Sequence, residues 1–286
     1  MGNYANPEKL VSTDWVNEHK DDANIRLLEV DVDTSAYDQG HIQGALGVNW
    51  ETQLNDQVRR DILTKSQFEE LAGNLGITPD TTVVFYGDNN NWFAAYALWQ
   101  FRYYQHAEEK LKIMNGGRKK WIQENRSLVK DVPSVKKSSY KAKFPDDNVR
   151  ADKELIRQNI STNRINLVDV RSPAEFTGEV IAPAGMTETA QRGGHIPGAV
   201  DIPWASAVKD DGTFKSYDEL KNIYKESDVN PERETIAYCR IGERSSHTWF
   251  VLKYLLGYDK VRNYDGSWTE WGNLVGYPIE KGNGSK

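Results

Sequence analysis

Cysteine is nearly absent from this sequence, which contains Cys239 and no other cysteine among its 286 residues. One cysteine excludes an intrachain disulfide and a cysteine-based zinc site, and it favours a reducing, cytoplasmic setting. The N-terminal residues lack the apolar core of a signal peptide, and no apolar run approaches the length of a membrane-spanning helix. An excess of basic residues is also missing: the net charge is -6, which argues against a general nucleic-acid binder.

The sequence does contain the material for a packed interior. Hydrophobic residues make up 38% of the chain, with 9 Trp and 14 Tyr, which is typical of a folded globular protein. A length of 286 residues is sufficient for two domains of ordinary size.

An internal repeat divides the chain into two similar halves. Four segments return in the same order: Leu27–Asp31 as Asn166–Val170, Gly40–Ala45 as Gly194–Ala199, Thr82–Tyr86 as Thr235–Tyr238, and Asn115–Trp121 as Asp265–Trp271. The period is far too long for a solenoid, so we interpret the repeat as a duplicated domain. We predict an N-terminal domain over 1–130, a linker over 131–147 and a C-terminal domain over 148–286. The linker lysines are expected to be solvated rather than to bind an acidic partner.

Short apolar runs alternate with amphipathic segments in both halves. In the second half this pattern predicts strands over 167–170, 235–238 and 261–264 and helices over 155–160, 217–224 and 246–256, the last stopped by Gly257. The alternation indicates an α/β fold with parallel sheets, in which active sites lie at the carboxyl ends of strands. Cys239 and Arg171 each follow such an end, so we expect them to be neighbours.

The most informative segment runs from Tyr238 to Arg244 and reads Tyr-Cys-Arg-Ile-Gly-Glu-Arg. A strand delivers the thiol to a short loop, and a helix follows at once. Loop N–H groups, the positive end of the helix and two guanidinium groups all favour a thiolate, so we predict a thiol pKa below the free value of about 8.5. The alternative is an inert cysteine buried at a strand end, which would need neither the loop nor the arginines.

The corresponding segment of the first half carries no thiol. Aligned on the helix that follows, Asp88 takes the place of Cys239. A carboxylate cannot carry sulfur and would repel an anionic substrate. We therefore expect the first domain to be catalytically silent and to contribute one wall of a cleft between the domains.

The five histidines show no spacing typical of metal ligands, and we expect no metal site. We interpret His41 and His195 as residues that stabilise turns, and His247 as structural. Asp169 is expected to brace loops by hydrogen bonding rather than to act in acid–base chemistry.

These features together resemble a tandem-domain rhodanese of the bacterial type, that is, a thiosulfate sulfurtransferase. The resemblance is carried by the duplication, the Gly-His-Ile-x-Gly-Ala turns, the Asp-Val-Arg strand end and the Cys-Arg-x-Gly-x-Arg loop, and it covers nearly the whole chain. It implies two rhodanese domains, each a five-stranded parallel sheet flanked by helices, with only the C-terminal domain catalytic.

The resemblance also implies roles for individual residues. Cys239 is similar to the nucleophile that becomes a persulfide. Arg171 matches an arginine that binds the substrate anion, and Arg244 occupies a loop position used for a cation or a hydroxyl. Trp92 and Phe93 match aromatic residues of the inactive domain that face the persulfide.

One loop position departs from the family pattern. Vertebrate thiosulfate enzymes have a lysine two places after the cysteine, where this chain has Ile241. Arg240 and Arg244 are candidates to supply the missing charge, although the alternation of side-chain direction suggests that Arg240 points outwards. The backbone N–H groups of Ile241, Gly242 and Glu243 would stabilise anions, and the Glu243 side chain is expected to point to solvent.

The resemblance implies a double-displacement reaction. The thiolate attacks the outer sulfur of thiosulfate, sulfite leaves, and cyanide, a cellular thiol or a sulfur-acceptor protein then takes the sulfur. No metal or organic cofactor is required, because the loop N–H groups and the arginines stabilise the anions directly.

Three other functions remain open from the sequence. Cysteine phosphatases need five residues between cysteine and arginine, whereas four separate Cys239 from Arg244, so the loop should be too tight for phosphate. Mercaptopyruvate sulfurtransferases typically have the loop Cys-Gly-Ser-Gly-Val-Thr, and the arginines here favour a dianionic inorganic donor instead. A sulfur carrier would load a persulfide without rapid turnover, and the intact loop argues against a pure scaffold.

Overall fold

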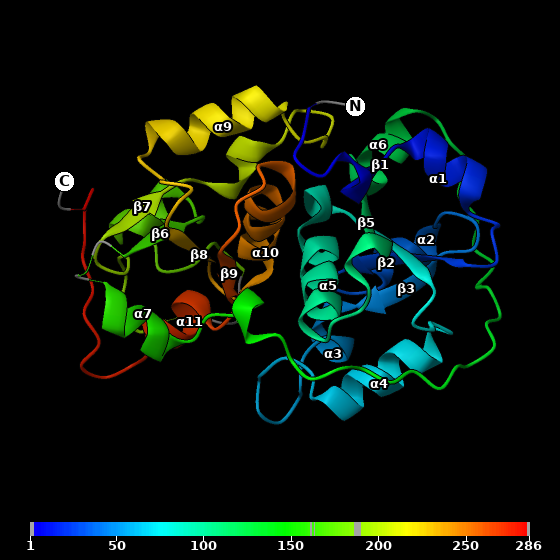
Figure 1. Ribbon diagram of the computed structural model, residues 1–286, viewed down its shortest axis with the longest axis horizontal. Coiled ribbons are helices and arrows are strands. Elements are labelled where there is room, and N and C mark those ends of the chain that lie inside the picture. Colours follow the sequence, from blue (N-terminus) through cyan, green and yellow to red (C-terminus); the bar gives the residue numbers. More distant parts are fainter. Residues whose placement is uncertain (1–2, 161, 163, 186–189, 285–286) are drawn as a thin grey trace. The chain divides into compact units, whose positions relative to one another are not determined.

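The computed structural model describes residues 3–160, 162, 164–185 and 190–284, and these residues form two compact units (Figure 1). The N-terminal unit comprises Pro7–Asp146 and Val208–Phe214. Among the described residues, the C-terminal unit comprises those within 3–6, 147–207 and 215–284. The domain boundaries drawn from the sequence stay a prediction, and no composition change marks 208–214, which group with the N-terminal unit.

The N-terminal unit is built on a five-stranded sheet in which every neighbouring pair is parallel. The strand order is β1-β5-β4-β2-β3, with β1 at Leu10–Val11, β2 at Ile25–Asp31, β3 at Leu46–Asn49, β4 at Thr82–Tyr86 and β5 at Leu111–Met114. The last four residues of β4 are buried, as expected for an apolar strand in the interior of a parallel sheet.

Six α-helices flank this sheet in the described part of the unit (Figure 1). They are α1 at Thr13–His19, α2 at Ser35–Gln39, α3 at Trp50–Gln53, α4 at Lys65–Asn74, α5 at Trp92–Tyr103 and α6 at Gly117–Gln123. The sequence marks where α4 begins, because Thr64 and Gln67 form a reciprocal capping box. Helix α5 is apolar nearly all round and is correspondingly buried along most of its length.

The C-terminal unit repeats this arrangement with a parallel sheet in the order β7-β6-β8-β9. The strands are β6 at Ile165–Asp169, β7 at Ala199–Asp201, β8 at Glu234–Tyr238 and β9 at Val261–Tyr264. The prediction of five strands holds for the first sheet, but four strands form the second. At the edge where β1 lies in the N-terminal unit, Arg150 makes a single parallel bridge to Asn263, so the fifth strand is reduced to one residue pair.

The helices of the C-terminal unit include all three that the sequence predicted. The α-helices described in this unit are α7 at Lys153–Asn159, α8 at Pro173–Thr177, α9 at Tyr217–Glu226, α10 at Glu243–Phe250 and α11 at Ser267–Trp271. The predicted helices correspond to α7, α9 and α10. A π-helical segment, Val251–Leu255, continues α10. The helical region ends before Gly257, whose φ of +76° favours glycine. Helix α10 follows β8 directly and packs against β8 and β9 (Figure 1).

The segment predicted as a linker packs against the rest of the N-terminal unit. Ser138 donates its backbone N–H to the carbonyl of Gly73, and Tyr140 lies in the core with its hydroxyl 2.9 Å from Nδ1 of His106. The lysines of this segment are all exposed, as the sequence suggested.

No helix among the described residues combines the length and apolar character needed to cross a bilayer.

Candidate active site

Cys239 stands at the carboxyl end of β8, where the sequence placed it. Its backbone N–H donates to the Ser267 hydroxyl at 3.0 Å, and its carbonyl accepts from the N–H of Trp268 at 3.1 Å. These bonds tie the residue to the start of α11. The loop then turns through Gly242, and α10 begins at Glu243.

The sulfur atom of Cys239 receives polar contacts from three directions. The Gly242 N–H donates to Sγ at 3.1 Å, and the hydroxyls of Ser245 and Ser267 lie 3.6 Å and 4.0 Å from it. The amino end of α10 adds its partial positive charge. This cradle is suited to an anionic sulfur, and it includes two serines that the sequence analysis did not identify.

Gly242 is the residue that makes this loop geometry possible. Its φ is +99°, in the left-handed region, and a Cβ there would lie 2.8 Å from Cα of Asp265. The Gly242 carbonyl is held by Ser246 Oγ at 2.6 Å and by Asn263 Nδ2 at 3.2 Å. Side chains from α10 and β9 therefore fix the loop conformation that aims the Gly242 N–H at sulfur.

The expectation that Glu243 points to solvent is wrong. The side chain is buried, with 4% of the residue exposed, and the Cys239 thiol donates to Glu243 Oε2 at 3.4 Å. The reason is local geometry: Glu243 follows Gly242 as the first residue of α10, and its side chain folds back over the loop toward Cys239.

The expectation of a low thiol pKa is also wrong. Burial raises the pKa of Cys239, and the neighbouring Glu243 carboxylate raises it further; Arg244 and the Ser245 hydroxyl act in the opposite direction without reversing the shift. Cys239 is 0% exposed, so desolvation of the thiolate dominates. The resting cysteine is therefore held as a thiol.

The charge of Arg244 is directed to carboxylates. Its Nη1 and Nη2 each donate to one oxygen of Glu175 at 3.1 Å, and its Nε lies 3.7 Å from Glu243 Oε1. Glu175 also closes the capping box with Ser172 at the start of α8. The sequence contains this capping-box signal but nothing that assigns Glu175, 69 positions away, as the partner of Arg244.

Arg171 lies in the core of the C-terminal unit. It is 0% exposed, its Nη2 donates to Asp169 Oδ2 at 2.6 Å and to the Gly194 carbonyl at 2.7 Å, and its guanidinium lies 4.5 Å from the Trp268 ring. These contacts make Arg171 a brace for the loops, and Asp169 braces them with it. The role of Arg171 in binding a donor anion stays a prediction.

The remaining residues that the sequence singled out are buried, apart from Trp92, which is half-buried. Arg240 is 7% exposed, which corrects the expectation that it points outwards, and Ile241 is 4% exposed. In the N-terminal unit, Trp92 and Phe93 open α5, and the Phe93 ring packs 5.2 Å from the ring of Trp50. The role of Trp92 and Phe93 as a pocket wall stays a prediction.

The strand registers correct the alignment of the silent copy. Tyr86 pairs with Glu29 as Tyr238 pairs with Asp169, so Gly87, not Asp88, takes the place of Cys239. A backbone hydrogen bond supports this correspondence. The Gly87 carbonyl accepts from the Arg118 N–H at 2.9 Å, just as the Cys239 carbonyl accepts from the Trp268 N–H. Alignment on the helix that follows is shifted by one residue, because the loop after β4 and the loop after β8 differ in shape.

An acidic pair occupies the rest of the silent site. By the same register Asp31 stands where the active copy has Arg171, and its Oδ1 accepts from the Asp88 N–H at 2.6 Å. Burial, with Asp88 beside it, raises the pKa of Asp31 to about 9. The site thus has neither a thiol nor the arginine of the active copy.

A cysteine introduced into this copy is not expected to become active. Neither Gly87→Cys nor Asp88→Cys should take up sulfur in a Cys239→Ser background, because a Cβ at position 87 would lie 2.6 Å from Asp31 Oδ1 and closer still to the Val30 carbonyl. Mass spectrometry after thiosulfate treatment is the measurement. Sulfur added at residue 87 or 88 would contradict this account of the silent loop.

The histidines hold turns, as the sequence suggested. Nδ1 of His41 lies 2.9 Å from the Tyr37 carbonyl, and Nδ1 of His195 lies 2.9 Å from the Phe176 carbonyl. Each ring also stacks on the ring of that same partner at 3.7 Å. In the described parts of the chain no cluster of three His, Cys, Asp or Glu side chains forms a metal site.

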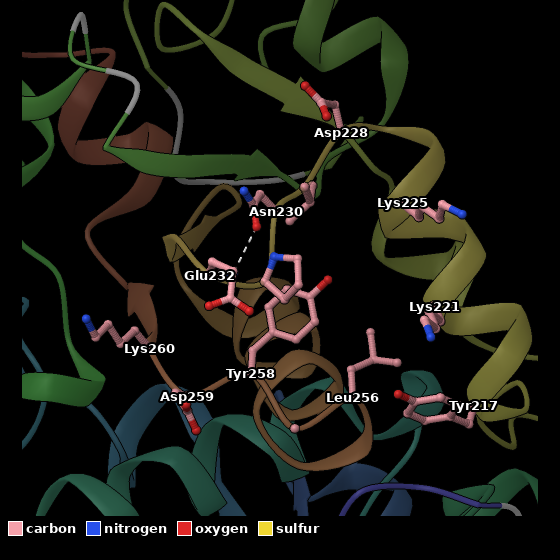
Figure 2. Close-up of a pocket in the computed structure, with 13 residues that line it drawn as sticks. Tyr217, Lys221, Lys225, Asp228, Asn230, Glu232, Leu256, Tyr258, Asp259 and Lys260 are labelled. Atoms are coloured by element: carbon pink, nitrogen blue, oxygen red, sulfur yellow. Dashed lines mark hydrogen bonds between the residues drawn. The ribbon is translucent and has the colours of Figure 1, made fainter.

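A pocket of about 640 Å³ lies at the amino end of β8, the opposite end from Cys239, and Figure 2 shows residues that line it. Glu232 and Lys260, which lie before β8 and β9, are among its lining residues. Three lysines and three acidic residues line it, so the pocket has no excess charge for an anionic substrate. It is separate from the cysteine loop.

The sequence matches the Rhodanese-like domain family twice, over residues 12–124 and 152–274. The chain belongs to the rhodanese family. This rhodanese is 56% identical over 279 residues to a Haloferax volcanii protein named "Putative thiosulfate sulfurtransferase", with 96% of each chain covered. It is 52% identical over 283 residues to "Sulfur carrier protein TtuD" of Thermus thermophilus, covering 98% of this chain and 99% of that one.

Among solved structures, this rhodanese is similar to the anaerobic ergothioneine biosynthesis enzyme from Chlorobium limicola in complex with trimethyl histidine. The TM-score is 0.87 at 26% identity, covering 99% of this chain and 72% of that chain. The tandem rhodanese architecture that the sequence indicated is therefore confirmed.

Proposed function

We propose that this rhodanese is a thiosulfate sulfurtransferase that carries sulfane sulfur as a persulfide on Cys239. The observation that carries the proposal is the cradle around Sγ, in which the Gly242 N–H and the hydroxyls of Ser245 and Ser267 converge on one atom. The names of the similar proteins support the same class of reaction.

The reaction has two steps. In the first, the Cys239 thiolate attacks the outer sulfur of thiosulfate, an S–S bond to cysteine forms, and the S–S bond of thiosulfate breaks with its electron pair leaving on sulfite. In the second, cyanide or a thiolate attacks the outer sulfur of the persulfide, and the electron pair returns to Sγ. Charge is conserved in each step, and the cysteine itself carries the transferred sulfur.

The cradle would act most strongly on the anionic sulfur. Hydrogen bonds to a charged acceptor are about twice as strong as neutral ones, so the Gly242 N–H would stabilise the thiolate and the persulfide more than the thiol. Gly242 and the residues that hold its carbonyl thus contribute by keeping the donor in place before the reaction begins.

A second candidate function is that of a persulfide carrier, which a specific observation favours. Arg244 and Arg171 are both paired with buried carboxylates, so their positive charge is already balanced before a dianion approaches. A site of this kind gains less from thiosulfate than one with unpaired arginines. The Thermus thermophilus relative carries the name of a sulfur carrier, which supports the same alternative.

Steady-state kinetics distinguish these functions and the use of mercaptopyruvate. With thiosulfate and cyanide, we expect parallel lines in double-reciprocal plots, as a double-displacement mechanism requires, and kcat/KM at least tenfold higher than with mercaptopyruvate. A higher value with mercaptopyruvate would overturn the donor assignment. Rapid loading by thiosulfate followed by slow turnover with cyanide, but fast transfer to a protein thiol, would favour the carrier.

A further inference from the structure

The side chains of Glu243 and Cys239 are in direct contact inside the C-terminal unit. Both side chains are buried, and the carboxylate oxygen Oε2 lies 3.4 Å from Sγ, within reach of the thiol proton. The carboxylate is an acid–base group in direct contact with the atom that reacts. Its place at the start of α10 is fixed by the left-handed turn at Gly242.

Beside this pair, the guanidinium of Arg244 lies between two carboxylates. From α10, Arg244 Nε lies 3.7 Å from Glu243 Oε1, and the same guanidinium pairs with Glu175 of α8. After β9, Asp265 pairs with Arg150 at 2.8 Å.

Three further charged or titratable side chains belong to the same unit, and Arg240, which follows Cys239, is buried as well. At the end of β6, Asp169 pairs with Arg171. His247, also in α10, is buried, and burial lowers its pKa to about 3, so it is neutral at neutral pH. Glu243 is therefore the carboxylate that contacts sulfur among the described residues.

We propose that Glu243 exchanges the thiol proton with Cys239 in both half-reactions, an assignment that rests on the proposed sulfur transfer. On loading, the proton moves from Sγ to Glu243 as the thiolate attacks the donor sulfur, and sulfite leaves with its electron pair. On unloading, the acceptor takes the outer sulfur, the electron pair returns to Sγ, and the proton moves back from Glu243. No proton enters or leaves the pair in a complete cycle.

The physical advantage is that the buried site never holds two negative charges on neighbouring groups. A thiol that lost its proton to water would leave a thiolate beside a carboxylate in a desolvated site, which is strongly unfavourable. If the two groups share one proton, the pair keeps a single negative charge. Burial and Glu243 raise the pKa of the thiol, so little thiolate would form at neutral pH by loss of the proton to water. Transfer of the proton to Glu243 would supply the thiolate instead.

A shared proton has a specific signature in the pH dependence of the rate. The singly protonated pair dominates between its two macroscopic pKa values, so the reactivity of Cys239 should change less than about twofold between pH 6 and 8. In Glu243→Gln the thiol can only titrate against water. Its reactivity should then rise about tenfold per pH unit up to the thiol pKa.

The test measures Cys239 reactivity from pH 5.5 to 9 in two ways: alkylation by iodoacetamide and sulfur loading by thiosulfate. Glu243→Gln is compared with wild type and with Glu232→Gln, a control that removes an exposed carboxylate from the same unit. Circular dichroism checks folding. Glu243→Asp, which keeps a carboxylate, should keep the flat profile at a lower rate.

The outcomes separate the proposals. A flat wild-type profile that becomes steep in Glu243→Gln supports proton exchange. A wild-type reactivity that rises steeply with pH overturns the proposal, and so does a flat pH profile that persists in Glu243→Gln. If the variant does not fold, the wild-type pH profile alone decides. If thiosulfate fails to load wild type at any pH, the sulfurtransferase function fails instead, while the alkylation profile still decides the role of Glu243.

Discussion

Replacing Cys239 with serine is expected to abolish sulfur transfer while leaving the fold intact. A serine hydroxyl is not ionised at neutral pH and cannot hold a persulfide, and loss of a catalytic nucleophile costs about a thousandfold or more in rate. The hydroxyl is nearly isosteric with the thiol and can still accept from the Gly242 N–H. Thiocyanate formation from thiosulfate and cyanide is the measurement.

Folding of the Cys239→Ser variant needs its own control. Circular dichroism and the thermal unfolding midpoint should match wild type closely, because the substitution changes one buried atom. Thiocyanate formation at more than about a hundredth of the wild-type rate, by a protein with a native spectrum, would sink the assignment of Cys239 as the sulfur carrier.

Replacing Arg171 with alanine is expected to lower the free energy of unfolding by about 3–5 kcal/mol, because the change leaves the Asp169 carboxylate buried without its partner. Both side chains are 0% exposed. The structure thus predicts a stability defect first, where the resemblance alone implies a defect in donor binding. Urea unfolding of the purified protein measures the difference.

Two variants make the Arg171 result interpretable. Arg164→Ala removes an exposed arginine from the same unit and should change the free energy of unfolding by less than about 0.5 kcal/mol. Removing both partners, in Asp169→Leu with Arg171→Met, should recover much of the loss because no buried charge is left alone. If Arg171→Ala is as stable as wild type and its KM for thiosulfate rises tenfold, Arg171 binds the donor and the brace assignment is wrong.

Much of the fold could be predicted because its signals are local. Apolar runs such as Thr235–Tyr238 fix where the buried strands lie, and Gly257 fixes where the long helical region ends. Because the sequence repeats, a strand predicted in one half is supported by the corresponding segment of the other half. The single parallel bridge at Arg150 could not be predicted, because whether an edge strand extends depends on tertiary packing.

The site could be located from the sequence, but its electrostatics could not. A cysteine loop between a strand and a helix identifies the reacting atom. The partners of charged side chains come from distant segments: Glu175 lies 69 positions from Arg244. Counting arginines near Cys239 therefore predicted a low thiol pKa, whereas burial and the inward carboxylate of Glu243 raise it.

The residue of the N-terminal unit that corresponds to Cys239 could not be identified from the sequence for a related reason. Asn89, Asn90 and Asn91 all have positive φ, so this loop follows a different path from Cys239–Gly242 before its helix begins. Alignment on the helices then shifts Asp88 onto the cysteine position. Strand pairing, which the sequence does not display, restores Gly87 to that place.

Sulfur transfer through Cys239 can be tested by a mass spectrum of the wild-type protein after thiosulfate treatment at neutral pH. We expect one added sulfur atom, located on the peptide that contains Cys239 and removed by cyanide. Since Cys239 is the one cysteine in the sequence, the assignment is unambiguous. An unchanged mass, or an equal gain in Cys239→Ser, would contradict the account.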